Sequence, residues 1–241
     1  KNLGGLTNIN LDSGIVITNG RAKTTTLDQF GVDGNGIDLA EDVTASNLWN
    51  LPGDAQLANE IGADVSDLND ACVLEFDFIP SGDTIKFRYV FSSEEYYPGY
   101  VCTYNDAFGF FLSGPGITGS PNIALIPGTN TPVSIFNVNN VTAPPANCPN
   151  NTAYYIDNTS NRYFTHDGHT SVFTAIHAVI PCQVYHLKLV VADFQDDALD
   201  TGVFLEAKSL TSNIVRLINN TQTDNLNNSY IVEGCITGSF S

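Results

Sequence analysis

The chain has 241 residues, of which 26 are Asp or Glu and nine are Lys or Arg, giving a formal net charge of −17. A field of this sign repels nucleic-acid phosphates and anionic membrane surfaces, so we expect no nucleic-acid partner. No stretch reaches the roughly 18 consecutive apolar residues that a membrane-spanning helix needs, so we expect no membrane insertion. The absence of Met indicates a mature or trimmed segment of a longer product.

Short runs of apolar residues, many of them alternating with polar ones, recur between clusters of Gly, Pro, Asn and Asp. This pattern predicts short strands. The runs lie at residues 15–18, 74–78, 85–91, 107–112, 123–126, 133–138, 153–156, 172–178, 184–192 and 202–210. The turn at residues 80–83 predicts a hairpin between the second and third runs. About ten such strands indicate an all-β, antiparallel β-sandwich of lectin-like or jelly-roll type.

One segment departs from the strand pattern and predicts a single short helix within residues 53–62. Leu57 and Ile61 are spaced i, i+4, Asp54 is a candidate N-cap, and Gly62 is a candidate C-terminal stop.

The composition changes after about residue 210, where the chain becomes rich in Asn and Thr. We therefore expect residues 1–210 to form the sandwich domain. Residues 211–241 are expected to connect it to a following module, or to add a packed terminal strand around Tyr230.

Five widely spaced cysteines without a CxxC pair argue against a zinc ribbon and favour structural disulfides. Cys102 and Cys148 both lie in segments rich in turn residues, and we expect them to pair. Cys72 and Cys182 remain candidates for buried free thiols.

Carboxylates gather at three places where a predicted strand meets a loop. Glu94 and Glu95 follow one apolar strand, and Asp106 enters another. The loop after residues 184–192 carries the third group: Asp193, Asp196, Asp197 and Asp200. Such carboxylates repel one another unless a cation or hydrogen-bond donors intervene, and a hard cation such as Ca²⁺ prefers oxygen ligands. We therefore expect a Ca²⁺ site, with a solvated acidic surface as the alternative.

The same residues give little support for catalysis, and we expect no catalytic residue and no enzyme activity. Adjacent strand residues point to opposite faces, so the adjacency of Glu94 and Glu95 does not imply a glycosidase pair. The chain has no GxSxG, HExxH or P-loop motif. A carbohydrate-active hydrolase that uses Glu94 or Glu95 with Asp106 remains an alternative. The sequence His-Asp-Gly-His at 166–169 could bind a transition metal, but its Gly indicates a loop.

Six motifs follow one another along residues 1–210. They are YVFSSEEY at 89–96, NDAFGFFLSGPG at 105–116, NIALIPGTN at 122–130, YYIDN at 154–158, YHLKL at 185–189 and GVFLE at 202–206. In this order they resemble the choice-of-anchor L family. By the resemblance, the matching acidic positions are Glu94, Glu95, Asp106, Asp193, Asp196 and Asp200, whereas Asp197 stands where a small residue is usual.

The resemblance implies a secreted or cell-surface location. The family occurs in large exported proteins of Bacteroidota, including adhesins similar to the mobile gliding-motility adhesin, which leave the cell through the type IX secretion system. We therefore expect a Ca²⁺-stabilised adhesin domain that binds a glycan or surface ligand. Its other expected partners are neighbouring modules of the same chain and the secretion machinery. Tyr96, Tyr97 and Tyr100 could offer stacking faces to sugar rings. The alternative is a structural spacer or cap of a surface filament that binds nothing itself.

Overall fold

The computed structural model describes residues 9–22, 46, 48–97, 99–160, 164–212, 216–217 and 230–231. Its strands are β1 (Gly14–Thr18), β2 (Leu68–Phe78), β3 (Thr84–Ser93), β4 (Ala107–Ser113), β5 (Tyr155–Asp157), β6 (Gly168–Thr170), β7 (Phe173–Ala178), β8 (Tyr185–Phe194), β9 (Thr201–Glu206), β10 (Thr211–Ser212), β11 (Arg216–Leu217) and β12 (Tyr230–Ile231). The helical elements are α1 (Ala55–Ile61) and three 3₁₀ turns, η1 (Val65–Asp67), η2 (Glu94–Tyr96) and η3 (Thr152–Tyr154).

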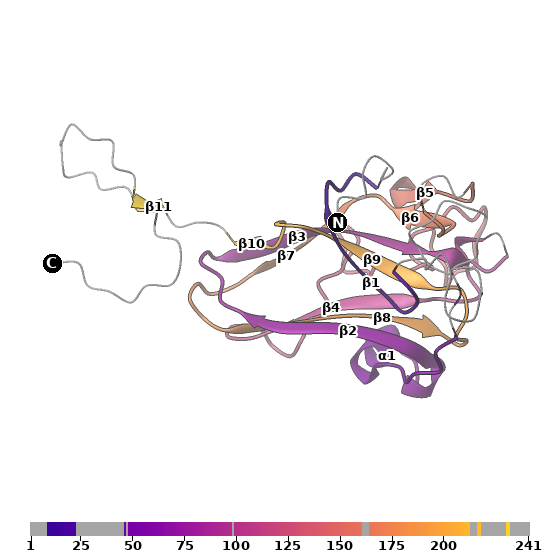
Figure 1. Ribbon diagram of the computed structural model, residues 1–241, viewed down its shortest axis with the longest axis horizontal. Helices are drawn as coiled ribbons and strands as arrows, with labels where there is room; N and C mark the ends of the chain where they lie inside the picture. Colours follow the sequence, from indigo (N-terminus) through magenta and orange to yellow (C-terminus); the bar gives the residue numbers. More distant parts are fainter. Residues whose placement is uncertain are drawn as a thin grey trace, which may run out of the picture.

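Two antiparallel sheets form stacked layers (Figure 1). The larger sheet has the order β1-β9-β3-β6-β5, with β7 and β10 also paired to β3, and the smaller one has the order β2-β8-β4. Strands β11 and β12 pair with each other in a separate two-stranded sheet. The prediction of an all-β antiparallel sandwich with one short helix is therefore confirmed. Within the described residues, no helix is long and apolar enough to cross a membrane.

Aromatic rings fill the space between the layers. Tyr89 and Phe91 of β3 face Phe108 and Phe110 of β4, and the Tyr89 and Phe110 ring centroids are 4.8 Å apart in an edge-to-face contact. Each fully buried ring of this size contributes about 1.5–3 kcal/mol through burial of its apolar surface. This core ties β3 of the larger sheet to β4 of the smaller one.

Helix α1 begins and ends where the sequence indicated. The Asp54 carboxylate accepts hydrogen bonds from the backbone N–H groups of Gln56 and Leu57, and Gly62 ends the helix in the left-handed conformation with φ of 73°. Leu57 is fully buried and packs with Phe111 and other residues of the smaller sheet. The helix therefore covers the outer face of that sheet.

Two details of the predicted strand arrangement are wrong. Residues 80–83 do not close a hairpin, because β2 and β3 belong to different sheets and the turn carries the chain from one layer to the other. Residues 123–126 and 133–138 make only isolated bridges, such as Leu125 with Pro132, because Pro and Gly interrupt any ladder there. The periodicity indicated apolar contact, which these segments do make with the core.

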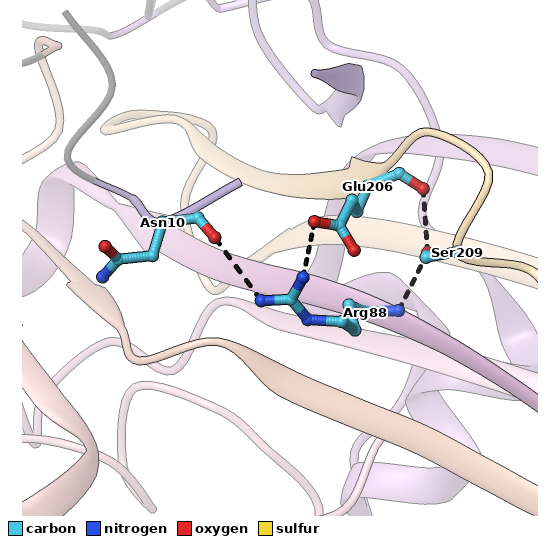
Figure 2. Close-up of polar contacts among 4 residues, drawn as sticks. All are labelled: Asn10, Arg88, Glu206 and Ser209. Atoms are coloured by element: carbon cyan, nitrogen blue, oxygen red, sulfur yellow. Dashed lines mark hydrogen bonds and ion pairs between the residues drawn. The ribbon is translucent and has the colours of Figure 1, made fainter. Parts of the chain in front are cut away.

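Polar contacts hold the end of β9 against β3 (Figure 2). The Arg88 guanidinium donates to the Glu206 carboxylate at 2.6 Å and to the Asn10 carbonyl at 3.5 Å. The Arg88 backbone N–H donates to the Ser209 hydroxyl, which in turn donates to the Glu206 carbonyl. These contacts fix the chain as it leaves β9.

The predicted disulfide between Cys102 and Cys148 is confirmed. Cys72 is a half-buried free thiol, in line with one of the two alternatives. Cys182 is disulfide-bonded, so the free-thiol alternative is wrong for that residue. Cys235 lies outside the described residues.

Candidate cation site

One end of the sandwich gathers carboxylates from several elements. The loop of residues 195–200 leaves β8 and crosses to β9 in the other sheet. Because the strands are antiparallel, the ends of β3 and β8 meet the start of β4 there, as the ladder partners Ala107 and Ala192 show. Glu95, Asp106 and Asp193 are each fully shielded from solvent at this end. The fold therefore brings together acidic residues that are up to about a hundred positions apart in the sequence.

Asp106 is the structural centre of this group. One carboxylate oxygen accepts a hydrogen bond from the Phe194 backbone N–H at 3.0 Å, and the other accepts one from the Thr201 hydroxyl at 2.7 Å. Both oxygens of Asp106 are thus used to connect the start of β4 to the end of β8 and the start of β9.

Asp193 is held from one side only. The Asn19 side-chain N–H₂ donates to one oxygen of the Asp193 carboxylate, and the Asn19 side-chain oxygen accepts from the Thr201 backbone N–H at 2.7 Å. The second Asp193 oxygen, Oδ2, is buried without a hydrogen-bond partner. Asn19 thereby orients Asp193 and leaves one oxygen available to a ligand.

Glu95 lies on η2, directly after β3. It is close enough to the backbone and carboxyl of Asp106 for both to affect its pKa, but neither of its oxygens makes a hydrogen bond of normal geometry. Glu94 is buried beside it, and its backbone N–H donates to the Asp200 carbonyl at 3.1 Å. Because successive residues of a 3₁₀ turn point about 120° apart, the two side chains diverge.

Burial is the main cause of strongly raised carboxyl pKa values in this group. Removal from water, together with the charges of Asp106 and Asp196, raises the pKa of Glu95 to about 11. Burial, with the charges of Asp106 and Asp200, likewise raises the pKa of Asp193. The pKa of Asp106 is raised less, because the hydrogen bonds from Thr201 and Phe194 oppose the effect of burial.

Within the described part of the chain, no basic side chain neutralises these carboxylates. The ion pairs found there lie elsewhere and involve Arg88, Lys188 and His186. Among the described residues, no group of three or more His, Cys, Asp or Glu side chains is placed to hold a metal ion. The arrangement therefore supplies unpaired buried oxygen atoms but not a finished coordination shell.

Asp196 and Asp200 complete the group at its edge. Asp196 is partly exposed, but its charge acts on both Glu95 and Asp106. The Asp200 carboxylate lies so close to Gly20 that a Cβ at that position would overlap it. Gly20 is thus required for the close approach of Asp200 to the end of β1.

Sequence reasoning missed Asn19 and Thr201, which hydrogen-bond to the carboxylates. It also missed Gly20, which leaves room for the Asp200 carboxylate, and Asp70, whose charge raises the pKa of Asp193. An Asn-Gly step after a predicted strand was a usable signal for Asn19 and Gly20. No local pattern links Asp70 to this end of the fold.

The loop between Glu95 and Asp106 carries exposed tyrosines. Tyr97 is 55% exposed and Tyr100 is 41% exposed, and their ring centroids are 5.8 Å apart. Tyr104 continues the row, 6.0 Å from Tyr100. Tyr96 instead faces the core, where it packs against Phe91 and Tyr155. We therefore restrict the candidate ligand face to Tyr97 and Tyr100.

A cavity of about 260 Å³ opens in another part of the sandwich, with lining residues from β1, β2, β3, β8 and β9. Its lining is apolar, including Leu74, Phe76 and Leu205, with Glu206 and Ser209 among its few polar residues. It does not include any carboxylate of the acidic group at the end of the sandwich.

Comparison with known proteins places the chain in a family but not beside a characterised relative. No curated protein and no solved structure matches the sequence. The sequence matches the family model of the choice-of-anchor L domain over residues 2–211, which is most of its length. The chain therefore belongs to the choice-of-anchor L domain family.

Proposed function

We propose that this domain is a Ca²⁺-stabilised adhesion module of a secreted or cell-surface protein, and that it binds a neutral glycan through Tyr97 and Tyr100. Choice-of-anchor domains generally occur in surface or secreted proteins, which supports the location. The disulfide between Cys102 and Cys148 is also typical of an oxidising compartment outside the cytosol. We further propose export by the type IX secretion system of a Bacteroidota cell.

The observation that carries the proposal is the exposed tyrosine pair on a constrained loop. Aromatic rings bind sugar rings by stacking, and little conformational entropy is lost when the rings are already held in place. The Cys102–Cys148 bridge and a backbone hydrogen bond from Tyr100 to the Tyr97 carbonyl restrict this loop. The net charge of −17 favours a neutral glycan over an acidic one.

A structural module of a surface filament is the second candidate. The observation that favours it is the burial of Glu95, Asp106 and Asp193, which puts a cation there in a position to stiffen the fold rather than to contact a ligand. The same burial gives no support for a hydrolase, because a catalytic carboxyl group must reach its substrate.

Binding to an array of immobilised neutral glycans, in the presence of Ca²⁺, tests the proposal. We expect wild type to bind and Tyr97→Ala and Tyr100→Ala each to bind about tenfold more weakly, since a stacking contact of 1–1.5 kcal/mol corresponds to that factor. Ile176→Ala, which removes an exposed apolar side chain on β7, is the matched control and should bind as wild type does. Wild-type protein that binds no glycan, while remaining folded, would leave the filament module as the better account.

A further inference from the structure

We infer that Glu95 and Asp193 are direct ligands of one Ca²⁺ ion, and that this ion fixes the base of the loop that carries Tyr97 and Tyr100. The inference deepens the proposed function and rests on it, because it assigns the ligands of the stabilising cation and couples that cation to the glycan face.

The hydrogen bonds at this end of the fold separate ligands from supports. Asp106 uses both carboxylate oxygens to accept from Phe194 and Thr201, so it is already committed to the protein. Neither buried oxygen of Glu95 makes a hydrogen bond of normal geometry, although Asp106 lies beside it, and one buried oxygen of Asp193 has no partner. A buried carboxyl group is destabilising when it is ionised without a partner, and coordination to a cation removes that penalty. Glu95 and Asp193 therefore have the atoms that a cation would take.

The chemistry of the donors favours Ca²⁺ over a transition metal. The available donors are carboxylate oxygens, and Ca²⁺ takes six to eight oxygen ligands in a flexible geometry. A bidentate Glu95, one oxygen of Asp193, and Asp200 or Asp196 with water molecules would meet that demand. His and Cys side chains, which zinc prefers, do not contribute to this group within the described residues.

Binding requires the acidic side chains to rearrange. Glu95 follows β3 of the larger sheet, whereas Asp193 lies near the end of β8 in the smaller one. As placed, no group of three or more His, Cys, Asp or Glu side chains in the described chain can hold a metal ion. An ion bound by both Glu95 and Asp193 would connect the two layers. In the described chain, the hydrogen bonds of Asp106 already connect the layers at this point.

The loop between Glu95 and Asp106 would respond to that connection. Glu95 lies two residues before Tyr97, and Asp106 immediately precedes β4, so both ends of the loop are anchored in the acidic group. Asp106 already fixes the second end through hydrogen bonds. Coordination of Glu95 would fix the first end, and the tyrosine rings would lose freedom with it.

Calorimetric titration of Ca²⁺ into the chelator-treated chain tests the assignment of ligands. We expect one ion per chain for wild type and at least a tenfold weaker affinity for Glu95→Gln and for Asp193→Asn. Asn19→Ala should weaken binding by about tenfold, because it removes the group that orients Asp193. Asp77→Asn, on the exposed part of β2, is the matched control and should bind Ca²⁺ as wild type does. Unchanged Ca²⁺ affinity in both Glu95→Gln and Asp193→Asn would overturn the assignment.

Hydrogen exchange of wild-type protein, with and without Ca²⁺, tests the coupling independently of any variant. We expect Ca²⁺ to slow exchange of the amides of residues 99–105 more than those of β7, which lies away from the site. Stabilisation of the fold by Ca²⁺ without slower exchange in residues 99–105 would overturn the coupling but leave the proposed module intact. The absence of any Ca²⁺ binding would overturn both the assignment of ligands and the Ca²⁺ stabilisation in the proposed function, whereas glycan binding through the tyrosines would still be decided by the array.

Discussion

Two regions of the fold bury ionisable side chains: the acidic group at the end of the sandwich, and a pair of histidines on or just before β6. The two regions differ in how they avoid the cost of a buried charge. His166 and His169 are almost completely buried, as Glu95 and Asp193 are. Burial penalises the charged form of each group, so it lowers the pKa of both histidines and raises the pKa of both carboxyl groups.

The difference lies in what neutrality requires at pH 7. A histidine is neutral there without any partner, and each ring still makes one hydrogen bond through Nδ1: His166 with the Ser92 hydroxyl, and His169 with the Thr170 carbonyl. A carboxyl group is ionised at pH 7 unless a proton or a cation compensates it. The acidic group, and not the histidine pair, is therefore the part of the described fold where burial conflicts with charge.

The largest effect is expected for Asp106→Ala, which removes the support of the acidic group. The substitution leaves the Phe194 N–H and the Thr201 hydroxyl without their acceptor, and each unsatisfied buried donor costs about 1–3 kcal/mol. We expect the free energy of unfolding in urea to fall by about 2–5 kcal/mol. A loss below about 1 kcal/mol would show that Asp106 does not hold this end of the sandwich together.

The second-largest effect is expected for removal of the disulfide, which tests the tyrosine loop separately from the acidic group. Replacing both Cys102 and Cys148 by Ala opens a covalent loop that spans 46 positions. The unfolded chain then gains entropy, and we expect the free energy of unfolding to fall by about 2–4 kcal/mol. Urea unfolding of the double variant against oxidised wild type measures this. An unchanged midpoint would mean that the acidic group alone orders the tyrosine loop.

The buried histidines predict that the free energy of unfolding depends on pH. Burial lowers the pKa of folded His166 to about 3, whereas the unfolded residue titrates near 6.5. Below pH 6.5 the unfolded state therefore binds a proton that the folded state does not, so stability is present above pH 6.5 and is lost as the pH falls towards 3. Between pH 6.5 and 5 we expect His166 to account for a loss of about 2 kcal/mol.

Urea unfolding across this pH range, for wild type and His166→Gln, checks that dependence. The variant should show a shallower slope, because Gln has no proton to gain. His177→Gln, on the outer strand β7, is the matched control for removal of an imidazole. An equal slope in wild type and His166→Gln would assign the pH dependence to other groups.

The smallest effect is expected for Glu95→Gln in the absence of Ca²⁺. In the cation-free fold the raised pKa keeps Glu95 protonated at neutral pH, and Gln is a neutral side chain of the same shape. We expect the free energy of unfolding to change by less than about 1 kcal/mol, as for a neutral hydrogen-bonding replacement. A large destabilisation without Ca²⁺ would show that ionised Glu95 already has a structural partner.

Much of the fold could be predicted because local patterns reflect it. Alternation placed β3 and β8, and the Asp54 and Gly62 caps placed α1, since both signals act between near neighbours in the sequence. The division of strands between two sheets could not be predicted, because the turn at 80–83 looks the same whether it closes a hairpin or crosses between layers. Strand β6 was missed because its three residues, Gly168–Thr170, are all buried and so do not alternate between apolar and polar.

The sequence could predict which residues gather in the acidic site, but not which of their oxygens are free to bind a ligand. Carboxylates at strand ends pointed to Glu95, Asp106 and Asp193, because antiparallel strands bring their ends together. Which oxygens are committed to hydrogen bonds depends on Asn19 and Thr201, which contact the acidic residues only in the fold. The burial of Tyr96 beside exposed Tyr97 likewise depends on the direction of η2, which a run of adjacent polar and aromatic residues does not specify.

Thermal unfolding of the chelator-treated domain, with and without added Ca²⁺, tests the cation site most directly, because a ligand that binds only the folded state raises the midpoint. At a Ca²⁺ concentration 100-fold above the dissociation constant, the expected stabilisation is about 2.7 kcal/mol. The account predicts a higher midpoint for wild type and none of this increase for Asp193→Asn. A wild-type midpoint that stays the same at millimolar Ca²⁺ would contradict it.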